Sequence, residues 1–252
     1  MKQLLLVFTM ILLFFSVTAQ VGKVGINTNN PQALLHVKDS SVLFSGATSL
    51  PVTPGNPPVS GAGIRMMWYT DKAAFRVGEV TNTNWDKDSI GDYSFAAGFN
   101  SKAKGYSSVV LGNANNATGD GSFAAGSFTT ASGNLSTTLG FGSRASGHNS
   151  TAIGYNSIAN GDYSIAAGHF VKANTFSSFV IGRYNDSSFI SQSAWNNADP
   201  LFIIGNGSSN SSRSNALTVL KNGNTGIGVI NPVEKLEING KTVTSNFQMT
   251  TG

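Results

Sequence analysis

The sequence of 252 residues contains no cysteine, and only 11% of its residues are charged. The absence of cysteine excludes disulfides and cysteine-based metal sites, so an extracellular fold would have to hold without cross-links. The charged share is less than half of the usual ~25%. The formal net charge is +4. The basic residues are scattered singly along the chain, so this charge reflects scarce acids and does not indicate a nucleic-acid surface.

Long apolar runs are also missing, except for one near the N-terminus. Lys2 precedes an apolar stretch over residues 4–15, and Val17-Thr18-Ala19 forms a small-residue cleavage site. This order predicts a signal peptide over residues 1–19. The stretch is too short to span a bilayer, which takes about 20 residues. We therefore expect a secreted or cell-surface protein, outside the outer membrane, with no membrane-spanning segment after cleavage.

Glycine is abundant, at 29 residues, and it recurs in a repeat of 14 residues that runs seven times over residues 90–187. Each unit reads G-x-x-S-x-A-x-G followed by six residues ending near Ala, and Thr175 replaces the first Gly of the seventh unit. Such a period is the signature of a solenoid, in which each unit stacks on the next. The signature positions of the repeat include Gly91, Ser94, Gly98, Ser108, Gly112, Ser122, Gly126, Ser136, Gly140, Ser150, Gly154, Ser164, Gly168, Ser178 and Gly182.

Residues alternate between two faces after each Ser, which predicts a strand. The Ser, the Ala/Val/Thr position and the Gly face one way, and they leave a thin roll. The other face pairs large with small or medium apolar residues, as a buried face of fixed volume per coil would. We therefore expect that face to close against partner chains. Its predicted members are Phe95, Val109, Leu111, Phe123, Leu139, Ile153, Ile165, Phe179 and Ile181.

The repeat resembles the head of trimeric autotransporter adhesins, the YadA-like left-handed parallel β-roll, and Ser150-Thr151-Ala152-Ile153-Gly154 is a close version of its motif. The resemblance implies an all-β, left-handed parallel β-roll of about seven coils and a homotrimer with apolar columns around a threefold axis. It also implies an adhesive role toward an unknown host, matrix or glycan ligand. The sequence shows no sustained heptads for a coiled-coil stalk, so the resemblance does not extend to the way in which these adhesins are anchored in the membrane.

A second internal repeat brackets the roll. Residues 24–37 and 225–238 both read as strand, Asn-Pro turn and strand, similar to elements of phage tail-fibre-like bacterial surface proteins. Strand signals at residues 64–69 and 73–77 predict a capping β-hairpin, and Asn222-Gly223 is a hairpin turn signal. The predicted order is residues 1–19 signal peptide, 20–40 N-terminal fibre adapter, 41–89 β-hairpin cap, 90–187 head repeats, 188–222 β connector, 223–241 C-terminal fibre adapter and 242–252 tail.

No motif predicts catalysis, a cofactor or a metal site. His36, His148 and His169 lie apart in the sequence, and there is no G-x-S-x-G or H-E-x-x-H motif. Turn chemistry explains the acidic turn positions Asp92, Asp120 and Asp162 better than a calcium ladder does. An aromatic column with Phe99, Phe141, Tyr155 and His169 could stack on sugars, although packing at a corner accounts for it more simply.

The sequence therefore predicts a non-enzymatic trimeric adhesin-like structural protein that attaches through its roll, with no nucleic-acid partner. The alternative is a spacer of a tail-fibre-like surface fibre that binds nothing itself. A parallel β-helix enzyme would need a carboxylate cluster on one face, and the spacing supplies none.

Overall fold

The computed structural model describes residues 22–243, so the predicted signal peptide and most of the predicted tail lie outside the described residues. The chain divides into two units, Met1–Ser45 and Gly46–Gly252. The secondary structure of residues 22–243 is all strand apart from two short 3-10 helices, η1 (Thr70–Lys72) and η2 (Lys87–Ser89). The prediction of an all-β parallel solenoid is confirmed, while left-handed winding stays a prediction from the family resemblance.

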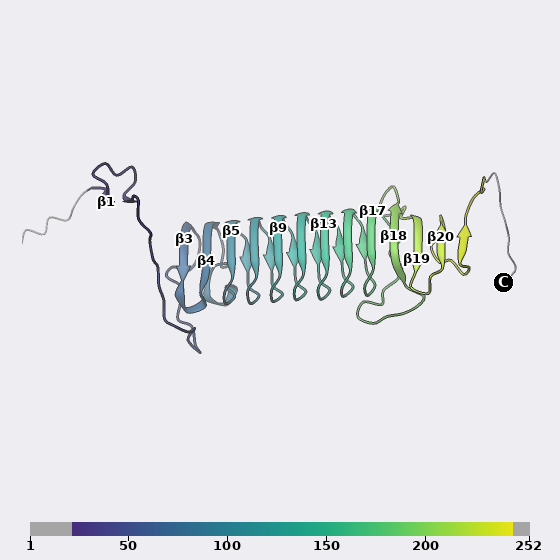
Figure 1. Ribbon diagram of the computed structural model, residues 1–252, viewed down its shortest axis with the longest axis horizontal. Coiled ribbons are helices and arrows are strands. Elements are labelled where there is room, and N and C mark those ends of the chain that lie inside the picture. Colours follow the sequence, from purple (N-terminus) through teal and green to yellow (C-terminus); the bar gives the residue numbers. More distant parts are fainter. Residues whose placement is uncertain (1–21, 244–252) are drawn as a thin grey trace, which may run out of the picture. The chain divides into compact units, whose positions relative to one another are not determined.

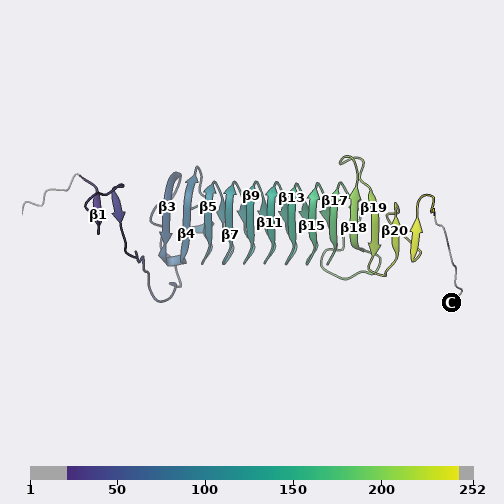
Figure 2. The same cartoon turned by 45° about the horizontal axis from the view of Figure 1, so that its top comes forward.

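The second unit contains a sheet of 13 strands and a sheet of six short strands. Each of the first six coils gives one strand to each sheet, and successive coils pair in parallel at an offset of 14 residues, as in Leu139↔Ile153 (Figures 1 and 2). The long strands of the coils are β5 (Phe95–Phe99), β7 (Val109–Asn113), β9 (Phe123–Ser127), β11 (Thr137–Phe141), β13 (Thr151–Tyr155), β15 (Ile165–His169) and β17 (Phe179–Arg183). The short strands are β6 (Lys102–Ala103), β8 (Asn116–Ala117), β10 (Thr130–Ala131), β12 (Arg144–Ala145), β14 (Ile158–Ala159) and β16 (Lys172–Ala173).

The interior of the roll is built from small side chains, as the repeat predicts. Ala96, Ala124 and Ala152 of the long strands and Ala103 of the short strands are fully buried. The Ser just before each long strand is also buried. In six of the seven coils its hydroxyl donates to the carbonyl three residues earlier, as Ser150 does to Gly147 O at 2.7 Å; this carbonyl belongs to the first Gly in five coils and to Thr175 in the last. This bond satisfies the hydroxyl within its own coil, so the polar column can lie in a dry interior.

Close stacking of the backbones explains the two Gly columns. A Cβ on Gly147 would lie 2.1 Å from Gly161 O, and one on Gly154 would lie 2.1 Å from Gly168 O. Gly154 also has a φ of +116°, a conformation that other residues rarely adopt. Thr175 can replace the first Gly in the last coil because no further coil stacks on it, and its hydroxyl donates to Pro200 O.

Both corners of the coil use left-handed backbone at non-glycine residues. The residue before each Ser has positive φ, for example Leu135 (57°) and Asn149 (52°), and so does the residue two after the second Gly, for example Phe128 (57°). Such residues cost about 1–2 kcal/mol each unless the surroundings fix them. The regular hydrogen bonds between coils supply that constraint, as from Leu135 N to Asp120 O at 2.7 Å.

A β-hairpin covers the first coil, as predicted. It consists of β3 (Gly63–Tyr69) and β4 (Ala74–Val80), and β4 pairs in parallel with β5. Arg76 stands in register with Ala96, in the interior column, and is fully buried. Its guanidinium donates to the backbone oxygens of Phe75, Ser94 and Ala103 and to the Ser94 hydroxyl. Burial lowers the pKa of Arg76 to about 10. This side chain closes the N-terminal end of the interior.

The last coil passes into the C-terminal strands. β18 (Pro200–Asn206) pairs in parallel with β17, and β19 (Asn215–Leu220) and β20 (Thr225–Ile227) continue the sheet in antiparallel order across the predicted Asn222-Gly223 turn. The six-stranded sheet ends earlier because Lys172 N donates to the side-chain oxygen of Asn185, whereas Ile158 N in the preceding coil donates to the backbone oxygen of Val171. The seventh coil therefore has only its long strand.

The two flanking elements share one local structure, in agreement with the internal repeat. In the first unit, β1 (Val24–Ile26) pairs in parallel with β2 (Leu35–Val37), and in the second unit β20 pairs in the same way with β21 (Leu236–Ile238). A side chain of the second strand accepts a hydrogen bond from the turn in both elements. His36 Nδ1 accepts from Gln32 N at 3.2 Å, and Glu237 Oε2 accepts from Val233 N at 3.0 Å.

Candidate functional site

The outward side of the 13-stranded sheet carries two apolar columns that run through the coils and both caps; we call this surface the apolar face. Cross-strand partners lie on the same side of a sheet, so the register defines its members. It contains no charged residue, and its polar members are three threonines. One column is Trp68, Phe75, Phe95, Val109, Phe123, Thr137, Thr151, Ile165, Phe179, Phe202, Val219, Thr225 and Leu236. The other is Met66, Val77, Ala97, Leu111, Ala125, Leu139, Ile153, Ala167, Ile181, Ile204, Leu217, Ile227 and Ile238.

All nine residues predicted from the sequence to form the partner-facing surface lie on the apolar face. In the single chain, Leu111, Ile153, Ile165 and Phe179 are 37–42% exposed. The other five, Phe95, Val109, Phe123, Leu139 and Ile181, are half-buried. The prediction stopped at the coils, but the register adds cap residues such as Met66, which is 70% exposed. The chain alone leaves this surface open to solvent along all 13 strands.

In the aromatic column at the corner after the second Gly, the rings of Phe141, Tyr155 and His169 pack against one another, while Phe99 is 40% exposed. The rings of Phe141 and Tyr155 stack with centroids 5.1 Å apart and planes 9° apart, and Tyr155 stacks on His169 at 5.3 Å. Phe170 and Tyr184 stack at 4.9 Å on the next corner position. Stacking on a sugar needs a free ring face, and these rings use their faces on one another. The geometry favours corner packing over a row of sugar-binding rings.

The acidic turn positions serve the backbone of the neighbouring coil. Asp120 Oδ1 accepts a hydrogen bond from Tyr106 N at 2.9 Å, and Asp162 Oδ1 accepts one from His148 N at 2.8 Å. Asn134 does the same for Asp120 N. Among residues 22–243, no group of three or more His, Cys, Asp or Glu side chains is placed to hold a metal ion. These contacts account for Asp and Asn at this position by turn chemistry.

Comparison with known families supports the resemblance that the repeat suggests. The family described as YadA head domain repeat (2 copies) matches residues 89–115, 103–129 and 145–170. These residues include β5–β9 and β13–β15 of the stacked coils described above. The matched coils are similar to YadA head domain repeats, in agreement with the parallel solenoid that they form. Comparisons with curated proteins and with solved structures returned no match.

One interior column of the head repeats was missed from the sequence. The residue three after the second Gly is buried in every coil, and it is polar in all but the sixth, where it is Val171. Its side chain bonds the next coil: the Ser143 hydroxyl donates to Gly154 O at 3.0 Å, and Ser157 donates to Gly168 O at 2.8 Å. The recurrence of Ser, Thr or Asn at this position could have indicated a buried polar column. In the first, second, fourth and fifth coils this column adds a side-chain bond to the next coil beside the backbone ladder.

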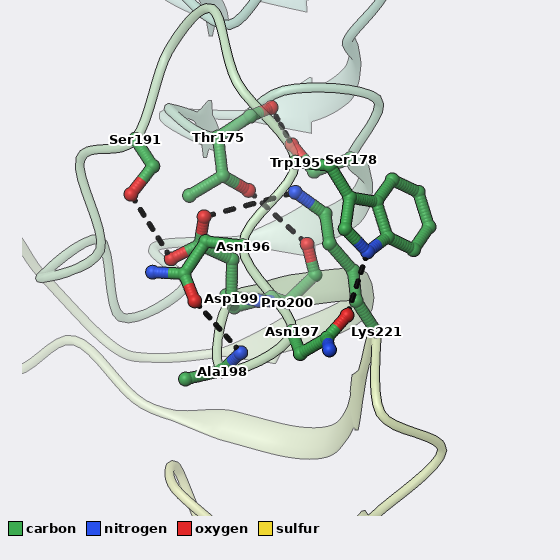
Figure 3. A network of polar contacts seen from close by, with 10 residues as sticks. All are labelled: Thr175, Ser178, Ser191, Trp195, Asn196, Asn197, Ala198, Asp199, Pro200 and Lys221. Carbon is green, nitrogen blue, oxygen red and sulfur yellow. Dashed lines mark hydrogen bonds and ion pairs between the residues drawn. The ribbon is translucent and has the colours of Figure 1, made fainter.

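A buried ion pair closes the C-terminal end of the head repeats. Lys221 N donates to Asp199 O across the start of the β18–β19 hairpin, and Lys221 Nζ lies 3.7 Å from Asp199 Oδ2 (Figure 3). The Lys221 side chain is fully buried, with Nζ 5.0 Å from the centre of the Trp195 ring and 5.8 Å from that of Phe176. Burial lowers the pKa of Lys221, and Asp199 opposes that shift. The pair fastens the loop over residues 186–199 to the end of the roll.

Replacing Lys221 with Met should destabilise the protein by about 3–5 kcal/mol, because Asp199 is left as a buried charge without its partner. Met keeps the apolar contacts with the two rings, so lost packing contributes little. The double variant with Asp199→Asn should recover most of the loss, as measured by urea unfolding. Equal stability of the Lys221→Met variant and the unchanged protein would show that the pair does not hold the loop.

No helix within the described residues is long and apolar enough to cross a membrane.

Proposed function

We propose that this protein is a secreted, non-enzymatic surface module that assembles as a homotrimer through the apolar face. The observation that carries the proposal is the continuity of that face over 13 strands, with neither column broken by a charge. Exposed apolar surfaces of this extent mark sites of protein association. Three parallel copies around a threefold axis would cover the face with identical contacts, in line with the trimeric adhesins that share these repeats.

The assembled module would present its six-stranded sheets outward, because these lie on the opposite side of each roll from the apolar face. We propose that the outward sheets make the attachment to a host or matrix component. The three histidines have structural contacts that do not require catalysis. His36 Nδ1 accepts a hydrogen bond from Gln32 N, His148 Nδ1 lies 3.0 Å from Asn134 O, and His169 stacks on Tyr155 and meets Tyr184 edge to face.

A spacer in a surface fibre is the second candidate, and the paired flanking elements favour it. The element at β1–β2 recurs at β20–β21 with the same pairing, so two copies of one element flank the head repeats in the sequence. A spacer would need only the apolar face for assembly and its two ends for connection to the rest of the fibre.

Binding assays on the mature protein separate the two candidates. We expect immobilised protein to capture a matrix protein or a glycan from a screened panel, and substitutions on the outward sheet to abolish that capture. Binding that is lost only with changes in the flanking elements, or no binding to any component of the panel, would favour the spacer.

A further inference from the structure

The repeat sorts the few charges of the head repeats onto different sides of the roll. On the six-stranded sheet, the outward position of the short strand is Lys102, Arg144 or Lys172 in three of the six coils. Lys104 follows two residues after Lys102, at the end of the same sheet. We call these four residues the basic stripe. Lys102, Arg144 and Lys172 are scattered singly in the sequence, but their spacings are multiples of the 14-residue period, so the stacked coils bring them into register.

The charges of the basic stripe are not neutralised by ion pairs. The salt bridges of the described residues join Lys38 to Asp39 and Lys221 to Asp199, and neither involves the stripe. Three acids of the coils lie on the turn position, where Asp120 and Asp162 accept backbone hydrogen bonds, and Asp92 at this position lines the same surface pocket as Lys104.

Only Asp186 shares the outward position, in the last coil, and its carboxylate binds Ser188. At the same end, burial and then the like charge of Arg213 lower the pKa of Lys172. At the outward position, three cations thus stand against one carboxylate.

The wide spacing of the cations in the basic stripe favours a ligand that is a sparsely charged, hydroxyl-rich polymer. With coils about 4.8 Å apart, the four cations of the stripe extend over about 24 Å. Duplex DNA carries a negative charge every ~1.7 Å, far denser than the stripe, and single strands are bound on exposed aromatic rings that this sheet does not offer. Between the cations the outward positions are Asn116, Thr130 and Ile158, and neighbouring positions carry Thr118, Ser132 and Asn160. These amides and hydroxyls suit the hydroxyl groups of a sugar chain.

We propose that the basic stripe binds an acidic polysaccharide lying along the axis of the roll. The inference rests on the proposed surface role, and it names the class of ligand. Three stripes, one on each outward sheet of a trimer, would let one polymer or several neighbouring chains engage the protein at more than one site.

The test compares two variants of equal charge in the trimeric mature protein. The first replaces the stripe (Lys102→Gln, Lys104→Gln, Arg144→Gln, Lys172→Gln), and the second replaces four exposed lysines of the flanking segments (Lys23→Gln, Lys38→Gln, Lys235→Gln, Lys241→Gln). The probe is heparin, with neutral dextran and single-stranded DNA for comparison. We expect heparin binding that weakens with added NaCl, a loss of about 10- to 100-fold in the first variant, and a change within about twofold in the second.

Equal losses in both variants would overturn the proposal, because they would reflect net charge and not the stripe. Binding of DNA as tight as that of heparin, or no heparin binding by the unchanged trimer, would also overturn it. Light scattering on the same samples distinguishes this failure from failure of the proposed function, since a trimer that does not bind heparin rejects only the ligand class.

Discussion

Replacing Leu139 with Asp is expected to convert the assembled protein into monomers. Leu139 lies in the middle of the apolar face, between Ala125 and Ile153 in register. In a trimer each chain would bury one carboxylate without a partner, at a cost of about 3–5 kcal/mol per chain, and the three charges would lie near one another around the axis. Light scattering should therefore give the monomer mass for this variant at concentrations where the unchanged protein is assembled.

Leu135 provides the matched control, four residues earlier in the same coil. It is 57% exposed and lies at a corner, away from the apolar face. Its φ is 57°, a conformation that Asp tolerates well. The Leu135→Asp variant should keep the assembled mass. If Leu139→Asp remains assembled and as stable as the control, the apolar face is not the contact between chains.

Replacing Gly154 with Ala should destabilise the roll by roughly 3 kcal/mol or more. The added Cβ would lie 2.1 Å from Gly168 O in the next coil, and the φ of +116° is unfavourable for alanine. The backbone on both sides is fixed by the pairing of β13 with β15, so neither strand can move away without breaking the ladder. Thermal and urea unfolding should both register the loss.

Gly121→Asn serves as the control for that experiment. Gly121 has a φ of +63°, and Asn149 already occupies the same corner position two coils later with a φ of 52°. The nearest obstacle is the end of the flexible Leu135 side chain. This variant should change the free energy of unfolding by less than about 0.5 kcal/mol, as surface substitutions usually do. A similar loss in both variants would mean that close backbone stacking is not what selects Gly154.

The coils could be predicted well from the sequence because each coil requires the same residue types at the same positions. Seven aligned copies revealed three features without a structure. These are the recurrent Ser, the two recurrent Gly positions and the alternation of residues along the strand. The capping hairpin was also predicted, with strands at residues 64–69 and 73–77 where the structure has Gly63–Tyr69 and Ala74–Val80. The Asn222-Gly223 turn was predicted because these residue types favour hairpin turns.

The ends of the roll could not be predicted in the same way because each occurs once. Arg76 looked like an ordinary strand residue, and only its register with Ala96 places its guanidinium in the interior. Lys221 and Asp199 are 22 positions apart, and the antiparallel pairing of β18 with β19 brings them together. The basic stripe was hidden for a related reason, since charges spaced by three and two coils look scattered until the coils are stacked.

The mass of the mature protein in solution tests the central claim most directly. Multi-angle light scattering on the unchanged protein should give three times the mass of one chain, at concentrations where the Leu139→Asp variant gives one. A stable, soluble monomer of the unchanged protein would contradict the account, because the apolar face would then remain open to water along the whole 13-stranded sheet.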